Sequence, residues 1–291
     1  MKKILSVIMA ITMLMGMTVL FSSCNKKEEF VIGITYFEPM NYFDDNGELV
    51  GFETEFAKAV CEKLGLEPKF QEIDWNTKET ELNSGAIDCI WNGMTITDER
   101  KENMGISEPY MQNKQVLVVK AENLEKFSDA ANFADAKIVA ESKSAGETVA
   151  TTDDLFKDSV FTAVDTQAKT LMEVKSGTAD AAILDYVASI GMIGEGTEYD
   201  MLTVVEKYEF SPEQYGIAFR KDDNEMREKF QKAIDELMAD GTIEKIAKKY
   251  KLDSLLVKCA CQKSGMGIEC SWRCSSCHRR QMTFRRGLCA S

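Results

Sequence analysis

The chain has 291 residues and a net charge of −13 at neutral pH, with 48 acidic and 35 basic side chains. Such an acidic balance argues against a nucleic-acid partner and against direct binding to an anionic membrane surface. Hydrophobic residues make up 44% of the chain, which is enough for the core of one large domain or of two smaller lobes.

Residues 1–23 are expected to form a lipoprotein signal peptide. Lys2 and Lys3 precede an apolar run over residues 4–21, and Ser22-Ser23-Cys24 follows it. A basic start, an apolar centre and small residues before a cleavage point are typical of secretory signals. Residues 21–24 resemble a bacterial lipobox, which predicts a lipid on Cys24 and a place on the extracytoplasmic face of the cell membrane. Because the run is long enough to span a bilayer, an uncleaved anchor is the alternative. Residues 24–29 are interpreted as a polar tether.

Strands and helices alternate over the central part of the chain. Short apolar or β-branched runs predict strands at residues 30–34, 68–73, 86–91, 115–119, 137–140, 181–184 and 215–219. Apolar residues at helical spacing, often followed by a glycine, predict helices at residues 52–64, 77–84, 145–151, 166–175, 226–240 and 243–250. The alternation indicates an α/β architecture with largely parallel strands. Cys61 and Cys89 fall within these elements, as buried free thiols or as a disulfide.

The most informative stretch is residues 92–100, directly after the strand at 86–91. It places a glycine, two threonines and Arg100 at the end of that strand. Thr97 is expected to cap a short helix, whose start favours an anion. Arginine presents a planar fork of donors that matches both oxygens of a carboxylate. The stretch therefore indicates a carboxylate clamp, although a plain helix cap with a solvated arginine has the same pattern.

Residues 258–291 differ from the rest of the chain. They contain six of the nine cysteines, the only histidine, and seven basic residues against one acidic residue. The run 274–278 has the Cys-x-x-Cys-His spacing of c-type haem attachment, and its cysteines with Cys259 and Cys261 could also bind zinc. Without apolar periodicity, neither helix nor strand is favoured. We expect an unstructured basic tail with no metal and no cofactor, and keep zinc and haem as alternatives.

The order of motifs over residues 30–252 resembles that of family 3 extracellular solute-binding proteins, the amino-acid receptors of ABC importers. The motifs lie at residues 31–33 with Pro39, and at 46–52, 73–75, 84–88, 93–100, 107–110, 177–182, 215–221 and 240–243. The resemblance implies an α/β, two-lobed, periplasmic-binding-protein-like fold of type II. Lobe 1 would comprise residues 30–114 and 215–257, and lobe 2 residues 115–214, with hinge strands near 115–119 and 209–214. Residues 258–291 have no counterpart in the family.

The resemblance also implies roles for residues at the first lobe's side of a cleft. Arg100 would hold the ligand α-carboxylate, Thr95 would add a hydroxyl and a backbone N–H, and Gly93 would offer its backbone to the ligand amino group. Trp75 and Phe37 would form aromatic walls around the ligand side chain. Core packing is the alternative role for each wall.

In lobe 2, Ser144 and Ala145 would give backbone N–H groups to the same carboxylate. Family members often carry threonine where Ala145 stands and glycine where Lys143 stands. Asp185 would pair with the ligand ammonium, with a solvated strand-end carboxylate as the alternative. Glu38 and Asn92 are further candidates for contact with the ligand side chain, or else residues of the rim.

The function implied is that of a lipid-anchored, monomeric receptor that binds a free polar amino acid and passes it to an ABC transporter permease. It would not be an enzyme and would need no cofactor. The body of the chain lacks histidine, a P-loop and a Gly-x-Ser-x-Gly motif. An alternative is a cyclohexadienyl-dehydratase-like enzyme on the same fold, with Glu38 or Glu141 as proton donor. A third is the sensing domain of a receptor, which the lack of a downstream membrane-spanning segment disfavours.

Overall fold

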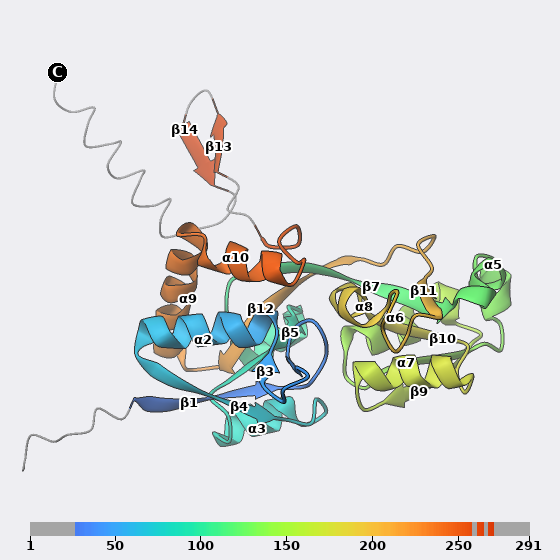
Figure 1. Cartoon of the computed structure of the whole chain (residues 1–291), viewed down its shortest axis with the longest axis horizontal. Helices are drawn as coiled ribbons and strands as arrows, with labels where there is room; N and C mark the ends of the chain where they lie inside the picture. The colour runs from blue at the N-terminus through green and yellow to red at the C-terminus, as the bar shows by residue number, and fades with distance from the viewer. Residues whose placement is uncertain (1–26, 258–260, 265–266, 271–291) are drawn as a thin grey trace, which may run out of the picture.

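The computed structural model describes residues 27–257, 261–264 and 267–270. They form two α/β lobes joined by two long strands, which confirms the predicted fold class (Figure 1). The expected signal peptide and lipidated Cys24 lie outside the described residues. Within the described part of the chain, no helix has both the length and the apolar composition needed to cross a membrane.

Lobe 1 is built mainly from the N-terminal part of the chain. Its strands are β1 (Glu28–Ile34), β2 (Tyr42–Phe43), β3 (Leu49–Val50), β4 (Leu66–Glu72), β5 (Cys89–Thr95) and β6 (Met104–Ile106). Its helices are α2 (Phe52–Leu64), α3 (Lys78–Ser84), α4 (Asp98–Asn103), α9 (Asn224–Ala239) and α10 (Thr242–Lys249). Helices α2 and α9 pack on this sheet, where the rings of Phe56, Trp91 and Phe230 meet edge to face.

Lobe 2 is formed by one continuous segment. Its strands are β8 (Lys137–Glu141), β9 (Val160–Val164), β10 (Ala181–Asp185) and β11 (Leu202–Val204). Its α-helices are α5 (Leu124–Phe127), α6 (Ala145–Thr152), α7 (Gln167–Ser176) and α8 (Tyr186–Met192), and its 3₁₀ turns are η2 (Ala121–Asn123), η3 (Ala130–Phe133) and η4 (Asp154–Phe156). A separate core lies here around the rings of Phe127, Phe133 and Phe156.

Two strands connect the lobes, β7 (Met111–Lys120) and β12 (Pro212–Arg220). The strand order is β4-β1-β5-β12-β7-β10-β8-β9, so a single sheet continues through both lobes. Strand β7 pairs with β12 up to Lys114 and with β10 from Gln115 onward. Both connecting strands run antiparallel to all their partners. Parallel pairing, expected for most of the sheet, is confined to β1 with its neighbours and β8 with its neighbours. The two connecting strands pair antiparallel because β7 runs from lobe 1 to lobe 2, whereas β12 runs back from lobe 2 to lobe 1.

Local signals placed most of the predicted elements well, whereas β9 and α8 were not predicted and β5 was misplaced. Helix α2 ends where predicted and α7 ends one residue later, because Gly65 and Gly177 adopt the left-handed conformation that closes a helix. Strand β5 begins at Cys89, three residues after the predicted start. The N–H of Ala86 is still bonded to the Glu81 carbonyl at the end of α3.

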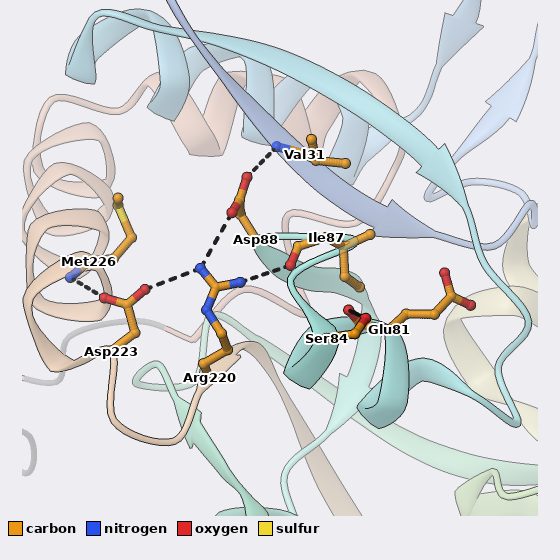
Figure 2. A network of polar contacts seen from close by, with 8 residues as sticks. All are labelled: Val31, Glu81, Ser84, Ile87, Asp88, Arg220, Asp223 and Met226. Carbon is orange, nitrogen blue, oxygen red and sulfur yellow. Dashed lines mark hydrogen bonds and ion pairs between the residues drawn. The ribbon is translucent and has the colours of Figure 1, made fainter.

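A polar network fixes the end of the lobe 1 sheet that lies away from the second lobe (Figure 2). The Arg220 guanidinium, at the end of β12, donates to the Ile87 carbonyl and to the carboxylates of Asp88 and Asp223. Asp88 in turn accepts the N–H of Val31 in β1 at 2.8 Å. The network therefore ties three neighbouring strands and the start of α9 together.

The cysteines fall into two groups. Cys61 and Cys89 are buried free thiols, which decides between the two alternatives for this pair. In the tail, the described strands β13 (Cys261–Ser264) and β14 (Gly267–Cys270) pair antiparallel, where the sequence favoured neither helix nor strand. The Cys-x-x-Cys-His run lies outside the described residues.

Candidate functional site

A cavity lies between the two lobes, at the ends of β5, β8 and β10. Ten residues line it: Trp75, Asn92, Gly93, Thr95, Arg100, Glu141, Ser144, Ala145, Gln167 and Asp185. Lobe 1 contributes half of them and lobe 2 the other half, so the cavity exists only while the lobes face each other. Its volume of about 10 Å³ is close to that needed for a single water molecule, so a larger solute requires the lobes to move apart.

Arg100 is positioned by the helix that it helps to start. The Thr97 hydroxyl caps α4 by accepting the Arg100 N–H at 3.1 Å, which confirms the predicted cap. The guanidinium donates to the Thr95 carbonyl at 2.7 Å and, across the cleft, to the Lys143 carbonyl at 3.2 Å. Burial lowers the pKa of Arg100, while the nearby Asp185 and Glu213 raise it. These two bonds leave three of the five N–H donors of an arginine for a ligand carboxylate.

The turn before α6 brings backbone donors to the same place. Lys143 has a φ of 55°, in the left-handed region that favours glycine. This conformation explains why the resemblance implies a glycine where Lys143 stands. Its Nζ donates to the Asn76 carbonyl of lobe 1 at 2.8 Å. The Ser144 hydroxyl caps α6 by accepting the Glu147 N–H at 3.2 Å. The Ala145 N–H lies in the first helical turn, where the helix offers it no carbonyl and where anions are favoured.

Asp185 ends β10 on the lobe 2 side of the cavity. Its Oδ1 accepts the side-chain amides of Asn113 at 2.7 Å and Gln115 at 2.6 Å, and its Oδ2 accepts that of Gln167. Burial raises the pKa of this carboxyl, and the three amides act in the opposite direction. Because neutral amides orient the carboxylate without cancelling its charge, a ligand ammonium would supply the missing positive charge.

Glu213 connects this group to the strand that returns to lobe 1. Its Oε2 accepts the Thr95 hydroxyl at 3.0 Å and the amides of Asn113 and Gln115, each at 3.1 Å. Burial, and then Asp185, raise the pKa of Glu213. The one hydroxyl hydrogen of Thr95 is thus directed to Glu213, whereas the resemblance assigned it to the ligand.

Gly93 lies at a crowded point of the lobe 1 wall. It has a φ of 53°, and a Cβ there would come within 3.2 Å of the Phe37 and Tyr215 rings. Its N–H donates to Glu53 Oε1 at 2.7 Å. Glu53 is 1% exposed and also accepts the amide of Asn41 and the hydroxyl of Tyr110. Burial raises the pKa of Glu53 to about 7.

Of the two expected aromatic walls, only Trp75 borders the cavity. Its buried Nε1 has no hydrogen-bond partner among the described residues. Lys78 lies 4.6 Å from the Trp75 ring centre and donates to the Trp75 carbonyl at 3.0 Å. Phe37 is instead packed behind Gly93 in the core of lobe 1, because its N–H is bonded to the Asn41 carbonyl and the loop folds back on itself.

The further candidates, Asn92, Glu38 and Glu141, also differ in whether they line the cavity. Asn92 lines the cavity, but its side chain both donates to and accepts from Thr35 and so joins β5 to the end of β1. Glu38 is not one of the cavity-lining residues, and its carbonyl lies against Gly191 of α8. Glu141 lines the cavity, is 5% exposed, and has its pKa raised to about 8, chiefly by burial.

Sequence reasoning missed the residues that hold the charged groups in place. Asn113 and Gln115 had only a weak signal: residues at positions i and i+2 of a strand share one face, but all four residues from Gln112 to Gln115 are polar, so nothing singled out that face. Glu53 had none, since an acidic residue in the first turn of a helix is ordinary. Within the described residues, no group of three potential metal ligands is arranged to hold an ion.

Known proteins share this architecture and this sequence pattern. Residues 30–253 match the model of the family described as bacterial extracellular solute-binding proteins, family 3. The probable amino-acid-binding protein YxeM of Bacillus subtilis is 30% identical over 229 residues, which cover 74% of this chain and 81% of that protein. A substrate-binding protein of an ABC uptake transporter from Streptococcus pneumoniae, solved with bound histidine, superposes with a TM-score of 0.70 at 28% identity and covers 79% of this chain and 95% of its own. An ancestral amino acid-binding protein, a precursor of cyclohexadienyl dehydratase, superposes with a TM-score of 0.67 at 28% identity, covering 76% and 95%.

Proposed function

Because this chain belongs to the bacterial extracellular solute-binding proteins of family 3, we propose that it is a lipid-anchored receptor that delivers a polar amino acid to an ABC importer. The ligand would bind between the lobes, and the closed form would be recognised by the permease. The observation that supports this most is the pairing of opposite charges in one cavity, with Arg100 from lobe 1 and Asp185 from lobe 2.

The two charges suit the two ends of an amino-acid zwitterion. The α-carboxylate would accept the free N–H groups of Arg100 and the backbone N–H of Ala145 at the start of α6, whereas the Ser144 N–H already donates to the Glu141 carbonyl at 3.3 Å. The ammonium would donate to Asp185, which the amides of β7 and α7 already hold in place. In a buried cleft each charge-assisted hydrogen bond contributes about 1.5–3 kcal/mol. Three or four such bonds amount to about 5–12 kcal/mol before the entropic cost of association, so contacts of the ligand side chain must supply the rest of a micromolar affinity.

The decisive experiment is titration calorimetry with the twenty amino acids, first on the native protein and then on Arg100→Ala. We expect micromolar or tighter binding of at least one polar amino acid and no measurable binding of it to Arg100→Ala. Arg227→Ala is the matched control, because Arg227 lies on α9 and contacts Asn224 in the same helix rather than the cavity. Unchanged affinity in Arg100→Ala would contradict the assignment of the carboxylate site.

The dehydratase alternative gains one observation from the structure. Glu141 is a buried acid in the cavity, and its raised pKa keeps it protonated near neutral pH, as a general acid requires. Turnover of prephenate or arogenate would favour that alternative, and its absence together with amino-acid binding favours the receptor.

A further inference from the structure

Glu141 is a second acidic group in the cavity, beyond the one that an amino-acid zwitterion needs. It ends β8 in lobe 2 and lines the same cavity as Arg100, Asp185 and Trp75. Its side chain is almost completely buried. Asp185 and Glu53, the neighbouring buried acids, each accept three hydrogen bonds, whereas no hydrogen bond or ion pair joins the Glu141 carboxylate to another described residue.

Two basic residues near Glu141 are already committed elsewhere. Lys78 donates to the Trp75 carbonyl, and Arg100 donates to the carbonyls of Thr95 and Lys143. The charged groups that act on Glu141 are Asp185 and Asp74, which raise its pKa, and Lys78 and Arg100, which lower it; burial outweighs them all. A structural ion pair therefore does not explain this carboxyl group, and a buried acid without a partner is costly to keep.

Neither charge of the zwitterion needs Glu141, so its carboxylate is free to contact the ligand side chain. In the proposed receptor, Arg100 takes the α-carboxylate and Asp185 takes the α-ammonium. Trp75 borders the same space with an aromatic ring, a surface that lies flat against an aliphatic stem or a guanidinium. Two cations of the protein already lie near this ring, Lys78 at 4.6 Å and Arg100 at 5.8 Å from its centre. The remaining wall thus presents an acceptor and an aromatic face, the two features that recognise a positively charged nitrogen.

Resting on the receptor function proposed above, we infer that Glu141 reads the ligand side chain and selects amino acids that carry a second positively charged nitrogen. That nitrogen is the guanidinium of arginine, the ammonium of lysine, or the distal ammonium of cystine. Neutral side chains of the same length leave Glu141 buried without a partner and bind more weakly.

Calorimetry with matched ligands tests the inference. Arginine is compared with citrulline, which has the same length and no charge, and lysine with norleucine; cystine is a separate arm for a second ammonium. On the native protein, at least one cationic ligand should bind more than about 10-fold tighter than its neutral counterpart, and Glu141→Gln should remove most of that difference. Glu122→Gln, an exposed acid of lobe 2, is the control and should keep it.

Proton release gives a second readout that a purely structural role would not change. Glu141 is largely protonated at pH 7 and must ionise to pair with a cation, so a cationic ligand should release close to one proton. Titrations in two buffers of different ionisation enthalpy measure this release. We expect it for the selected cationic ligand on the native protein, and expect it to be lost in Glu141→Gln, although Asp185 and Lys78 remain.

The outcomes separate the inference from the function on which it rests. If a neutral amino acid binds as tightly as its cationic counterpart, or if Glu141→Gln leaves the ratio of affinities unchanged, the selection by Glu141 is wrong and the receptor function stands. If no amino acid binds the native protein, both are wrong. Glu141→Gln should fold, because glutamine has nearly the shape of glutamate. Retained binding of a neutral ligand shows that the variant is folded.

Discussion

At the scale of single residues, the cavity is surrounded by acids whose ionisation opposes their burial. Glu53, Glu141 and Asp185 are buried and Glu213 is half-buried, and burial is the main cause of the raised pKa of each. Hydrogen bonds offset part of this cost at Glu53, Asp185 and Glu213. Such groups make the stability of the folded protein depend on pH.

Glu53 gives a pH dependence that can be measured. Its pKa is about 7 in the folded protein against an ordinary value of 4.5, so the folded state holds the proton more tightly than the unfolded state. Its contribution to stability is therefore greatest below about pH 4.5 and is lost as the pH rises to 7. The unfolding free energy of the native protein should fall between pH 5 and pH 8. We expect this fall to be about 2–3 kcal/mol smaller in Glu53→Gln, because glutamine does not titrate.

Urea denaturation at these two pH values measures this difference. Glu62→Gln, at an exposed position of the same helix α2, should follow the native protein. Because Glu141 and the hinge carboxyl groups titrate in both proteins, their contributions cancel in the comparison. Equal pH dependence in Glu53→Gln and the native protein would show that Glu53 is not the source.

At the scale of elements, the two lobes also meet at a close backbone contact outside the cavity. Helix α8 of lobe 2 meets the loop of lobe 1 at Glu38 and Pro39. A Cβ at Gly191 would lie 2.5 Å from the Glu38 carbonyl carbon and 2.6 Å from the Pro39 nitrogen. Since both atoms belong to the backbone, neither can move without moving the loop.

We therefore predict that Gly191→Ala keeps the lobes apart. The variant contains every residue of the cavity, yet ligand affinity should fall by about 10-fold or more, because binding must first overcome the clash. Small-angle scattering with saturating ligand should give a larger radius of gyration than for the native protein. Unchanged affinity and radius would mean that the loop adapts. Far-UV circular dichroism provides the folding control.

At the scale of the whole molecule, a membrane anchor would keep the proposed receptor close to its transporter. The chain begins with a basic and apolar segment before Cys24, and polar residues separate this cysteine from β1. The proposed lipid on Cys24 would tether the lobes to the membrane surface while leaving them free to reach the permease.

The anchor predicts a change of location. Cys24→Ser should carry no lipid label in cells grown with a labelled fatty acid. The variant should also leave the membrane fraction if its signal segment is still removed. Native protein should retain both the label and the membrane association. An unlabelled native protein that stays with the membrane would favour the uncleaved anchor instead.

Much of the fold and part of the site could be predicted because their signals are local. Gly65 and Gly177 end helices through their own backbone conformation, and Thr97 caps α4 within three residues. Arg100 could be singled out in the same way, from its spacing after a strand. The position of Phe37 could not, because it depends on a loop that folds back toward a distant glycine. Glu53 and Glu213 accept hydrogen bonds from partners 40 and 118 positions away, so the residues next to them in the sequence do not indicate these contacts.

Periodicity, glycine positions and ordered motifs were enough to predict the α/β character, most helix ends and the family, because these signals act within short stretches of chain. The tertiary structure alone decided which polar groups share the cavity. It brought Asp185 to the amides of β7, turned the Thr95 hydroxyl to Glu213, and left Glu141 without a partner beside Trp75. These arrangements depend on burial and on contacts between lobes, and both exist only once distant segments have been packed together.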